Sequence, residues 1–253
     1  MQDLRNKVVL VTGASSGIGA AAAEAFGAAG ANVIVHYRHR REQAQIVVER
    51  IKSGGGMALA LAADVTVSAE VDGLIADIKQ RFGRIDVLIN NAGGFVQRSL
   101  IVDADDDYID QVFRLNARSV VAVSRRVIPL MQHNGGGCII NVTTQAARTG
   151  GGPGAGLYAA CKGFVSTLTR TMAKELVKDR IRVNAVAPGV IDTAFHDGHS
   201  SAEMLRNFSA AIPMGRLGTA QECAGSFLFL ASDTASSYIT GQIVEVNGGQ
   251  VMP

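Results

Sequence analysis

The chain has 253 residues, 47% of them hydrophobic, and its formal net charge is +2 at pH 7. It is long and apolar enough to bury a large core, and its mild charge, without clustered Lys or Arg, argues against a nucleic-acid-binding protein. Three scattered cysteines, no signal-type apolar run near the start and no stretch of about 20 apolar residues favour a cytoplasmic protein without disulfides or membrane contacts.

Short aliphatic runs alternate along the chain with longer stretches that have helical apolar spacing. This alternation predicts an α/β fold, in one domain over 1–253, with a parallel sheet of about seven strands and helices on both faces. The predicted strands are 7–12, 32–36, 58–62, 85–90, 138–142, 181–186 and 243–246. The predicted helices include 16–29, 41–52, 68–82, 105–133 and 158–177.

The segment 192–214 interrupts this rhythm. It is polar at first and then weakly amphipathic, as in a mobile lid over a site. A surface insertion without a role is the alternative.

Polar or glycine-rich features follow five of the predicted strands. They are 12–19, Asp64, 90–93, the pair Thr143 and Thr144, and 188–189. Turn chemistry alone can place Gly or Asn at such positions, so each feature is ambiguous by itself. Because ligands bind beyond the carboxyl ends of the strands in an open parallel sheet, the five together predict a binding crevice there.

The first of these features is a glycine-rich loop, "TGASSGIG". Its glycines, Gly13, Gly17 and Gly19, leave room for a pyrophosphate to reach backbone N–H groups at the start of the next helix. The spacing differs from G-x-G-x-x-G, but the position between a strand and a long helix favours a dinucleotide site.

The second predicted strand ends without the acidic residue that NAD-dependent enzymes usually carry there. His36 and Tyr37 take its place, and Arg38, Arg40 and Arg41 follow. Their charge could hold a 2′-phosphate through charge-assisted hydrogen bonds, or could be only a solvated start to the next helix. We expect NADP(H) to be preferred, with NAD(H) possible and Arg38 the best single candidate.

Tyr158 and Lys162 lie four residues apart in a predicted helix and so share one face. An ammonium beside a phenol lowers the phenol pKa and helps it exchange a proton at neutral pH. The spacing alone is weak evidence, and the cofactor signals strengthen it.

With these residues in place, the sequence resembles the short-chain dehydrogenase/reductase family in its compact form, and is most like the 3-oxoacyl-[acyl-carrier-protein] reductases. The resemblance covers essentially the whole chain. It rests on "TGASSGIG", Asp64 with Val65, "NNAG" at 90–93, Asn116 within "LNARS", "YAACK", "PGVIDT" at 188–193 and the closing "ITGQIVEVNGG".

The resemblance implies a Rossmann-type doubly wound sheet and an NADPH-dependent oxidoreductase that reduces a ketone to a secondary alcohol. Tyr158 would be the general acid, Lys162 would lower its pKa and hold the nicotinamide ribose, and Asn116 would organise a water that relays protons to Lys162. Thr193 would contact the carboxamide. A homotetramer is implied, built through the helices that hold Asn116 and Tyr158.

The full cofactor set expected from the motifs is Gly13, Ser15, Ser16, Gly17, Ile18, Gly19, Tyr37, Arg38, Asp64, Val65, Asn91, Ala92, Gly93, Tyr158, Lys162, Pro188, Gly189, Val190, Ile191 and Thr193. No metal is expected, since His196 and His199 lie in a polar loop without further ligands.

One position departs from the family pattern. The hydroxyl that steadies the substrate oxygen usually belongs to a serine, and Thr144 stands there, one residue further from Tyr158 than usual. We expect Thr144 to serve, with Thr143 the alternative, because adjacent side chains at a strand end point to opposite faces.

The substrate is not named by these residues. The pocket that holds the substrate would be lined by the variable loops 94–102, 146–157 and 192–214. Segments 132–137 and 178–180, expected to border the site mouth, carry little of the basic charge that an acidic carrier protein would need. An acyl thioester therefore stays possible, as do small ketones, keto-esters and sugar-like carbonyls. An NAD-dependent alcohol or polyol dehydrogenase and a non-catalytic nucleotide sensor are the alternative functions.

Overall fold

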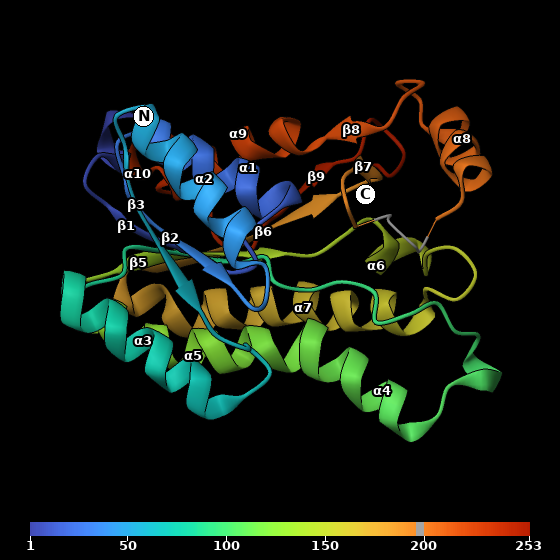
Figure 1. Ribbon diagram of the computed structural model, residues 1–253, viewed down its shortest axis with the longest axis horizontal. Helices are drawn as coiled ribbons and strands as arrows, with labels where there is room; N and C mark the ends of the chain where they lie inside the picture. Colours follow the sequence, from blue (N-terminus) through green and yellow to red (C-terminus); the bar gives the residue numbers. More distant parts are fainter. Residues whose placement is uncertain (196–199) are drawn as a thin grey trace.

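The computed structural model describes residues 1–195 and 200–253 and is built on one parallel β-sheet (Figure 1). Its strands are β1 (Val8–Val11), β2 (Asn32–Tyr37), β3 (Met57–Ala62), β4 (Val87–Asn90), β5 (Gly137–Val142), β6 (Ile181–Pro188) and β9 (Ile243–Val246). They lie in the order β3-β2-β1-β4-β5-β6-β9, and every neighbouring pair is parallel. The chain reverses its direction of progress between β1 and β4, which is where a doubly wound sheet opens a ligand crevice.

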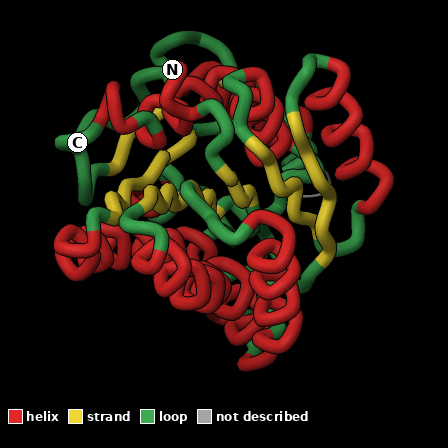
Figure 2. Tube along the Cα trace, turned by 90° about the vertical axis from the view of Figure 1, so that its left-hand side faces the viewer, coloured by secondary structure: helices red, strands yellow, loops and turns green. Residues whose placement is uncertain are grey.

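Helices cover both faces of this sheet. Their bounds are α1 (Gly17–Ala28), α2 (Arg41–Ser53), α3 (Ser68–Phe82), α4 (Asp106–Phe113), α5 (Ser119–His133), α6 (Ala146–Thr149), α7 (Gly156–Leu176), α8 (Ala202–Ala211), α9 (Ala220–Ala231) and α10 (Asp233–Ser236). In Figure 1, α3, α5 and α7 pack on one side of the sheet, and α1, α2 and α9 pack on the other; Figure 2 shows the strands between the two helical layers. The predicted Rossmann-type doubly wound fold is confirmed.

Two hydrophobic clusters fill the spaces between these layers. Successive strand residues point to opposite faces, so Val9 and Val11 join the cluster under α1 and α9, while Val8 and Leu10 join the one over α3 and α5. Burial on both faces explains why each strand is a continuous aliphatic run.

The longest predicted helix, 105–133, is divided in three. A π-helical turn, Arg114–Arg118, separates α4 from α5, because one extra residue is inserted between the two α-helical segments. Apolar spacing does not reveal such an insertion.

The C-terminal quarter holds the elements that the sequence pattern did not define. Helix α9 begins with a capping box between Thr219 and Glu222. The short strand β8 (Gly218–Thr219) comes directly before this helix and pairs in parallel with β7 (Ile191–Asp192). Part of the expected lid, 196–199 with His196 and His199, lies outside the described residues. Within the described ranges, no helix is long and apolar enough to cross a membrane.

Candidate active site

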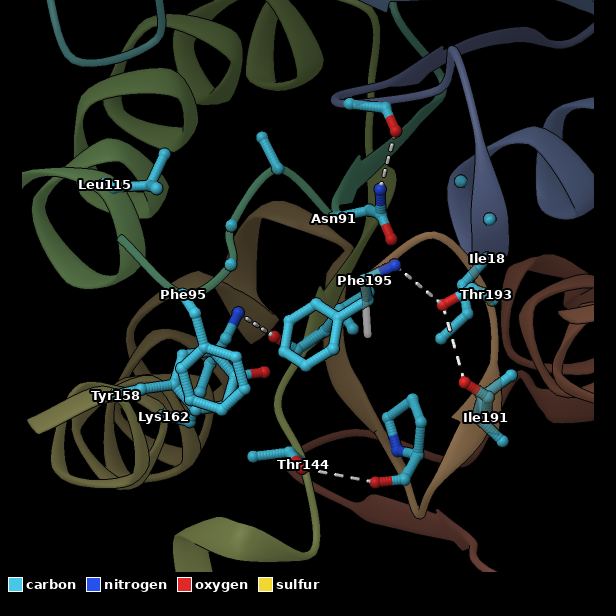
Figure 3. A pocket seen from close by; sticks show the side chains of 18 of the residues that line it. Ile18, Asn91, Phe95, Leu115, Thr144, Tyr158, Lys162, Ile191, Thr193 and Phe195 are labelled. Atoms are coloured by element: carbon cyan, nitrogen blue, oxygen red, sulfur yellow. Dashed lines mark hydrogen bonds between the residues drawn. The ribbon is translucent and has the colours of Figure 1, made fainter. Parts of the chain in front are cut away.

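A cavity of about 800 Å³ opens at the carboxyl edge of the sheet (Figure 3). All five strand-end features of the sequence line it, together with Thr144, Tyr158 and Lys162. The predicted cofactor residues that border the cavity are Gly13, Ser15, Ser16, Gly17, Ile18, Gly19, Arg38, Asp64, Val65, Asn91, Ala92, Gly93, Pro188, Gly189, Val190, Ile191 and Thr193. Tyr37 and Asn116 are the two predicted site residues outside this lining.

The glycine-rich loop has the shape that close approach of an anion requires. Gly13 and Gly17 adopt left-handed backbone conformations, with φ of +64° and +56°. A Cβ at Gly19 would lie 2.4 Å from the Asn91 Nδ2 atom. Ser16, the N-cap of α1, makes no side-chain cap hydrogen bond, so the first N–H groups of α1 remain available to a ligand.

Asn91 holds this loop against the end of β4. Its Nδ2 donates to the carbonyls of Thr12 (2.9 Å) and Gly13 (3.0 Å), and the Thr12 hydroxyl oxygen accepts from the backbone N–H of Asn91 at 2.9 Å. The two sides of the crevice are thus joined by side-chain to backbone hydrogen bonds.

His36 stabilises the loop from the second strand. It is 2% exposed, and burial lowers its pKa to about 4, so the ring is neutral. Nδ1 accepts from the Gly13 N–H at 3.0 Å, and the tautomer is thereby assigned, since Nε2 must donate to the Ala63 carbonyl at 2.9 Å. Both nitrogens are used within the protein, so His36 does not replace the missing acid as an acceptor.

Basic side chains surround the cavity end beyond β2. Arg38 and Arg40 line it, with Arg38 Nη1 3.6 Å from Asp64 Oδ2 and Arg40 Nη1 donating to Ser16 Oγ at 3.3 Å. Arg41 instead starts α2. Tyr37 is half-buried against the hydrophobic cluster under α1 and α9, because alternation along β2 turns it away from the face that His36 occupies.

Tyr158 and Lys162 lie on one face of α7, as predicted, and both side chains reach the cavity (Figure 3). Lys162 is 2% exposed, its Nζ donates to the Val142 carbonyl at 2.8 Å, and this atom lies 5.9 Å from the Tyr158 ring centroid.

The expected lowering of the Tyr158 pKa is not found. Burial raises the pKa of Tyr158 above its ordinary value near 10, and burial also lowers the pKa of Lys162 to about 8. Desolvation disfavours the charged form of each group, and it is the largest cause of both shifts.

The two candidate threonines differ in what their hydroxyls contact. Thr143 is buried, and its Oγ1 lies 2.9 Å from the Lys162 carbonyl and 2.8 Å from Ser166 Oγ. Among the described residues, the Thr144 hydroxyl makes two long contacts, donating to the Pro188 carbonyl and accepting from the Ala146 N–H, both at 3.3 Å. Thr144 therefore has the hydroxyl that can turn to a ligand at little cost.

Asn116 does not line the cavity but contacts the backbone of Gly94, which does. It is fully buried in the π-helical turn, where its Oδ1 accepts from the Gly94 N–H at 2.9 Å and its Nδ2 donates to the Gly94 and Val112 carbonyls at 3.0 and 3.1 Å. A Cβ at Gly93 would lie 2.9 Å from Asn116 Oδ1 and 3.1 Å from Lys162 Nζ. The backbone at Gly93 thus lies between Asn116 and the lysine.

The loops expected to line the substrate bring residues to Tyr158 that no sequence motif singled out. Phe95 packs on Tyr158 with ring centroids 4.7 Å apart, and Phe195 contacts both rings, at 4.9 and 5.7 Å (Figure 3). Arg98 lies over the Phe95 ring, 4.7 Å from its centroid. The available signal was their place beside motifs, since Phe95 follows "NNAGG" directly.

The expectation about carrier docking segments is wrong. Segments 132–137 and 178–180 come immediately before β5 and β6, so they lie at the amino edge of the sheet. The cavity lies at the carboxyl edge, so their charge says nothing about its mouth.

Metal ligation has no visible basis in the described ranges, where no group of three His, Cys, Asp or Glu side chains gathers.

Comparisons with known proteins extend over the whole chain. A family model described as Enoyl-(Acyl carrier protein) reductase matches residues 13–250. The 3-oxoacyl-[acyl-carrier-protein] reductase of Synechocystis sp. is 42% identical over 252 residues, covering 100% of each chain.

Two solved structures are also similar over the whole chain. The NADH-dependent reductase A1-R′ responsible for alginate metabolism has a TM-score of 0.92 and 40% identity, covering 100% of each chain. A 7α-hydroxysteroid dehydrogenase complexed with NADH and 7-oxo glycochenodeoxycholic acid has a TM-score of 0.92 and 35% identity, covering 100% of this chain and 98% of that chain.

Proposed function

Because the chain belongs to the short-chain dehydrogenase/reductase family, whose members are oxidoreductases acting on C=O and CH–OH groups, we propose that it reduces a ketone to a secondary alcohol with NADPH. The substrate would be a 3-oxoacyl compound or a related carbonyl. The observation that carries the proposal is the convergence of Thr144, Tyr158 and Lys162 with a glycine-rich loop in one cavity.

The cavity fits a dinucleotide. The Gly13 and Gly17 conformations and the uncapped start of α1 suit a pyrophosphate, and the predicted residues that border the cavity would hold the rest of the cofactor. A nicotinamide cofactor held by these residues would supply the hydride. Arg38 and Arg40 support a 2′-phosphate at the end of β2.

The side chains of the site divide the remaining work. The Tyr158 phenol donates its proton to the ketone oxygen, and its raised pKa keeps that proton in place at neutral pH. The Thr144 hydroxyl donates a hydrogen bond to the same oxygen as negative charge develops on it. Lys162 holds the nicotinamide ribose, and Asn116 organises the proton supply to Lys162 and positions the loop at Gly94.

The surroundings of the site follow from the same proposal. Residues 192–214 would form the lid, and Phe195 and Phe208 already line the cavity from this segment. A cytoplasmic homotetramer would bury the exposed rings of Phe113 on α4 and Phe164 on α7, whose centroids are 5.9 Å apart.

NADPH oxidation in the presence of 3-keto esters, diketones and an acetoacetyl thioester tests this function, with NADH run in parallel. We expect cofactor-dependent turnover that Tyr158→Phe abolishes while NADPH binding persists. Turnover with NADH alone would support the alternative, an NAD-dependent dehydrogenase. The names of two similar structures mention NADH, which favours this alternative. A Tyr158→Phe variant as active as the wild type would refute the mechanism, and absence of any turnover would favour a nucleotide sensor.

A further inference from the structure

We propose that the ketone reduced in this site carries a hydroxyl group within a few bonds of its carbonyl, and that the side-chain amide oxygen of Gln145 accepts a hydrogen bond from it. This inference rests on the proposed function and narrows its substrate class. Gln145 lines the cavity directly after Thr144 and has no part in the proton transfer or in the expected cofactor site.

The Gln145 amide has an unused acceptor. The residue is 8% exposed, and among the described residues its buried Oε1 atom has no hydrogen-bond partner. A buried amide oxygen that has lost water without a replacement is costly, and native proteins satisfy most such groups. Because Gln145 borders the cavity, a ligand there can supply the missing donor.

Two hydrogen bonds hold this amide in place. Its Nε2 donates to Gln250 Oε1 at 2.6 Å, which assigns the orientation of the amide and leaves Oε1 for a ligand. The backbone N–H of Gln145 donates to the Pro188 carbonyl at 3.0 Å. The acceptor is therefore positioned before a substrate arrives, and its side chain loses little entropy on binding.

This acceptor lies beside the group that would hold the ketone oxygen. The Pro188 carbonyl that accepts from the Gln145 N–H also accepts from the Thr144 hydroxyl, at 3.3 Å (Figure 3). A Cβ at Gly189 would lie 3.3 Å from Gln145 Oε1, so glycine leaves this side of the oxygen uncovered. A substrate whose carbonyl meets Thr144 and Tyr158 would thus bring a hydroxyl a few bonds away to Oε1.

The wall around this oxygen suits a neutral donor. It is formed by uncharged residues, which are Thr143, Thr144, Gln145, Ala146, Thr149, Gly151, Gly152, Ala155 and Gln250. An amide oxygen accepts from a hydroxyl and offers nothing to a carboxylate or a phosphate. An ammonium would lose far more hydration than a hydroxyl on entering such surroundings. The chemistry of the wall therefore favours a hydroxyl.

The experiment compares hydroxyketones with ketones in which a methyl group replaces the hydroxyl. The pairs are 1-hydroxypropan-2-one with butan-2-one, 3-hydroxybutan-2-one with 3-methylbutan-2-one, and 4-hydroxybutan-2-one with pentan-2-one. A hydroxyl also changes the intrinsic reactivity of the carbonyl. The measured quantity is therefore the hydroxyl preference in kcat/KM of the wild type divided by that of Gln145→Leu. For at least one pair we expect this ratio to be about 10 to 100, mainly through KM.

Two further comparisons identify the hydrogen bond. The methyl ethers of the three hydroxyketones have an oxygen that accepts but cannot donate, so they should lack the preference. Gln145→Glu keeps an acceptor oxygen and should retain part of it.

Gln132→Leu is the matched control. Gln132 is an exposed residue near the end of α5, and its amide donates to Asp179 at the amino edge of the sheet, away from the cavity. This variant should keep the full hydroxyl preference. Thermal unfolding shows that each variant is folded.

Four results would overturn the inference: the same hydroxyl preference in the wild type and Gln145→Leu for every pair, ethers preferred as strongly as alcohols, a loss in Gln145→Leu that is equal for all ketones and follows the Kd for NADPH, or turnover of keto esters but of no hydroxyketone. The second would mean that the amide nitrogen faces the substrate, and the third that the cofactor donates to Gln145. Each of them leaves ketone reduction intact. Absence of turnover with every carbonyl contradicts the proposed function instead.

Discussion

The Thr143 hydroxyl lies 2.9 Å from the backbone carbonyl of Lys162, a bond that ties the end of β5 to the middle of α7. Thr143 is 2% exposed, and its hydroxyl is also 2.8 Å from Ser166 Oγ. The hydroxyl of the adjacent Thr144 makes its two contacts with described residues at the longer distance of 3.3 Å. Both threonines border the cavity, but the Thr143 hydroxyl fixes the helix that carries the site lysine, whereas the Thr144 hydroxyl can turn to a ligand.

This division predicts different losses in the two alanine variants. Thr144→Ala should lower kcat for ketone reduction by about 10²- to 10³-fold, because a donor to the developing oxyanion is removed. Thr144→Ser keeps the hydroxyl and should lie within about tenfold of the wild type. Steady-state kinetics with one ketone and saturating NADPH measures both variants.

Thr143→Ala should act on stability. Loss of a buried hydrogen bond that leaves a carbonyl with fewer partners costs about 1–2 kcal/mol in the free energy of unfolding, measurable by urea denaturation. If Thr143→Ala abolishes turnover while Thr144→Ala is fully active, the assignment of the two hydroxyls is wrong by one residue.

Lys162 should destabilise the fold in a pH-dependent way. Burial lowers its pKa from 10.5 to about 8, so the penalty for the buried charge is fully present below pH 8 and is lost as the pH rises towards 10.5. At about 1.4 kcal/mol per pKa unit, the penalty is on the order of 3 kcal/mol. Lys162→Met should therefore unfold at higher urea than the wild type at pH 7, with a gap that narrows between pH 8 and pH 10.

Tyr158 adds a second pH dependence to the free energy of unfolding, which cancels when the wild type is compared with Lys162→Met. Its raised folded pKa lowers stability only above pH 10, where the unfolded state loses the phenolic proton and the folded state does not. Both proteins carry Tyr158. A stability gap that stays constant from pH 7 to pH 10 would show that folding does not lower the Lys162 pKa, because the ammonium would then be charged in both the folded and the unfolded state throughout this range.

The rate of reduction should follow the Lys162 titration in the ligand-free enzyme. Tyr158 stays protonated across neutral pH, whereas Lys162 loses its charge as the pH rises through about 8. We expect kcat/KM to be flat below that pH and to fall above it. Lys162→Arg keeps a permanent cation and should lose this falling limb, whatever its absolute rate. The same limb in both enzymes would assign it to another group.

Arg38 should decide between the two cofactors. Replacement by Gln removes charge-assisted hydrogen bonds to a 2′-phosphate and should raise the Kd for NADPH about 10- to 100-fold, with little change for NADH. The chain has no tryptophan, so titration calorimetry or the fluorescence of NADPH itself is the suitable readout. Arg81→Gln, at an exposed residue of α3 that pairs with Asp77, controls for net charge. Unchanged NADPH affinity in Arg38→Gln would show that the basic residues after β2 only solvate the start of α2.

The sequence was sufficient for the sheet because its signal is local. Strands buried on both faces must be aliphatic throughout, and the bounds of each of the seven observed strands lie within two residues of the predicted ones. The same logic predicted the crevice, since residues after parallel strands share one edge. The docking segments were misplaced because 132–137 and 178–180 precede their strands, and chain order alone could have corrected this.

The features that the sequence could not show are contacts and backbone irregularities that leave no periodic pattern of apolar residues. The contacts of Phe95 with Tyr158 and of Arg98 with Phe95 join loops whose paths follow no apolar repeat. The direction of Tyr37 is set by the phase of alternation along β2, which one residue reverses. The π-helical turn around Asn116 adds one residue within a stretch that otherwise has helical apolar spacing.

Asn116 gives the last prediction, because the π-helical turn aims its amide at a backbone outside the helix. Oδ1 and Nδ2 pair with both the N–H and the carbonyl of Gly94, at 2.9 and 3.0 Å, in the loop that continues to Phe95 and Arg98. Asn116→Ala leaves these buried groups without partners and should lower the free energy of unfolding by about 2–4 kcal/mol.

The same change should raise the KM for a ketone more than it lowers kcat, because the released loop carries Phe95 and Arg98, which line the cavity beside Tyr158. Asn116→Asp makes the comparison sharp. It keeps an oxygen that can accept from the Gly94 N–H but cannot donate to the Gly94 and Val112 carbonyls, and it buries a charge, so it should be at least as unstable as the alanine variant. Thermal unfolding and steady-state kinetics of both variants measure these effects. A fall in kcat with unchanged stability and unchanged KM would instead mean that Asn116 acts only in proton supply, and that the Gly94 loop holds its position without it.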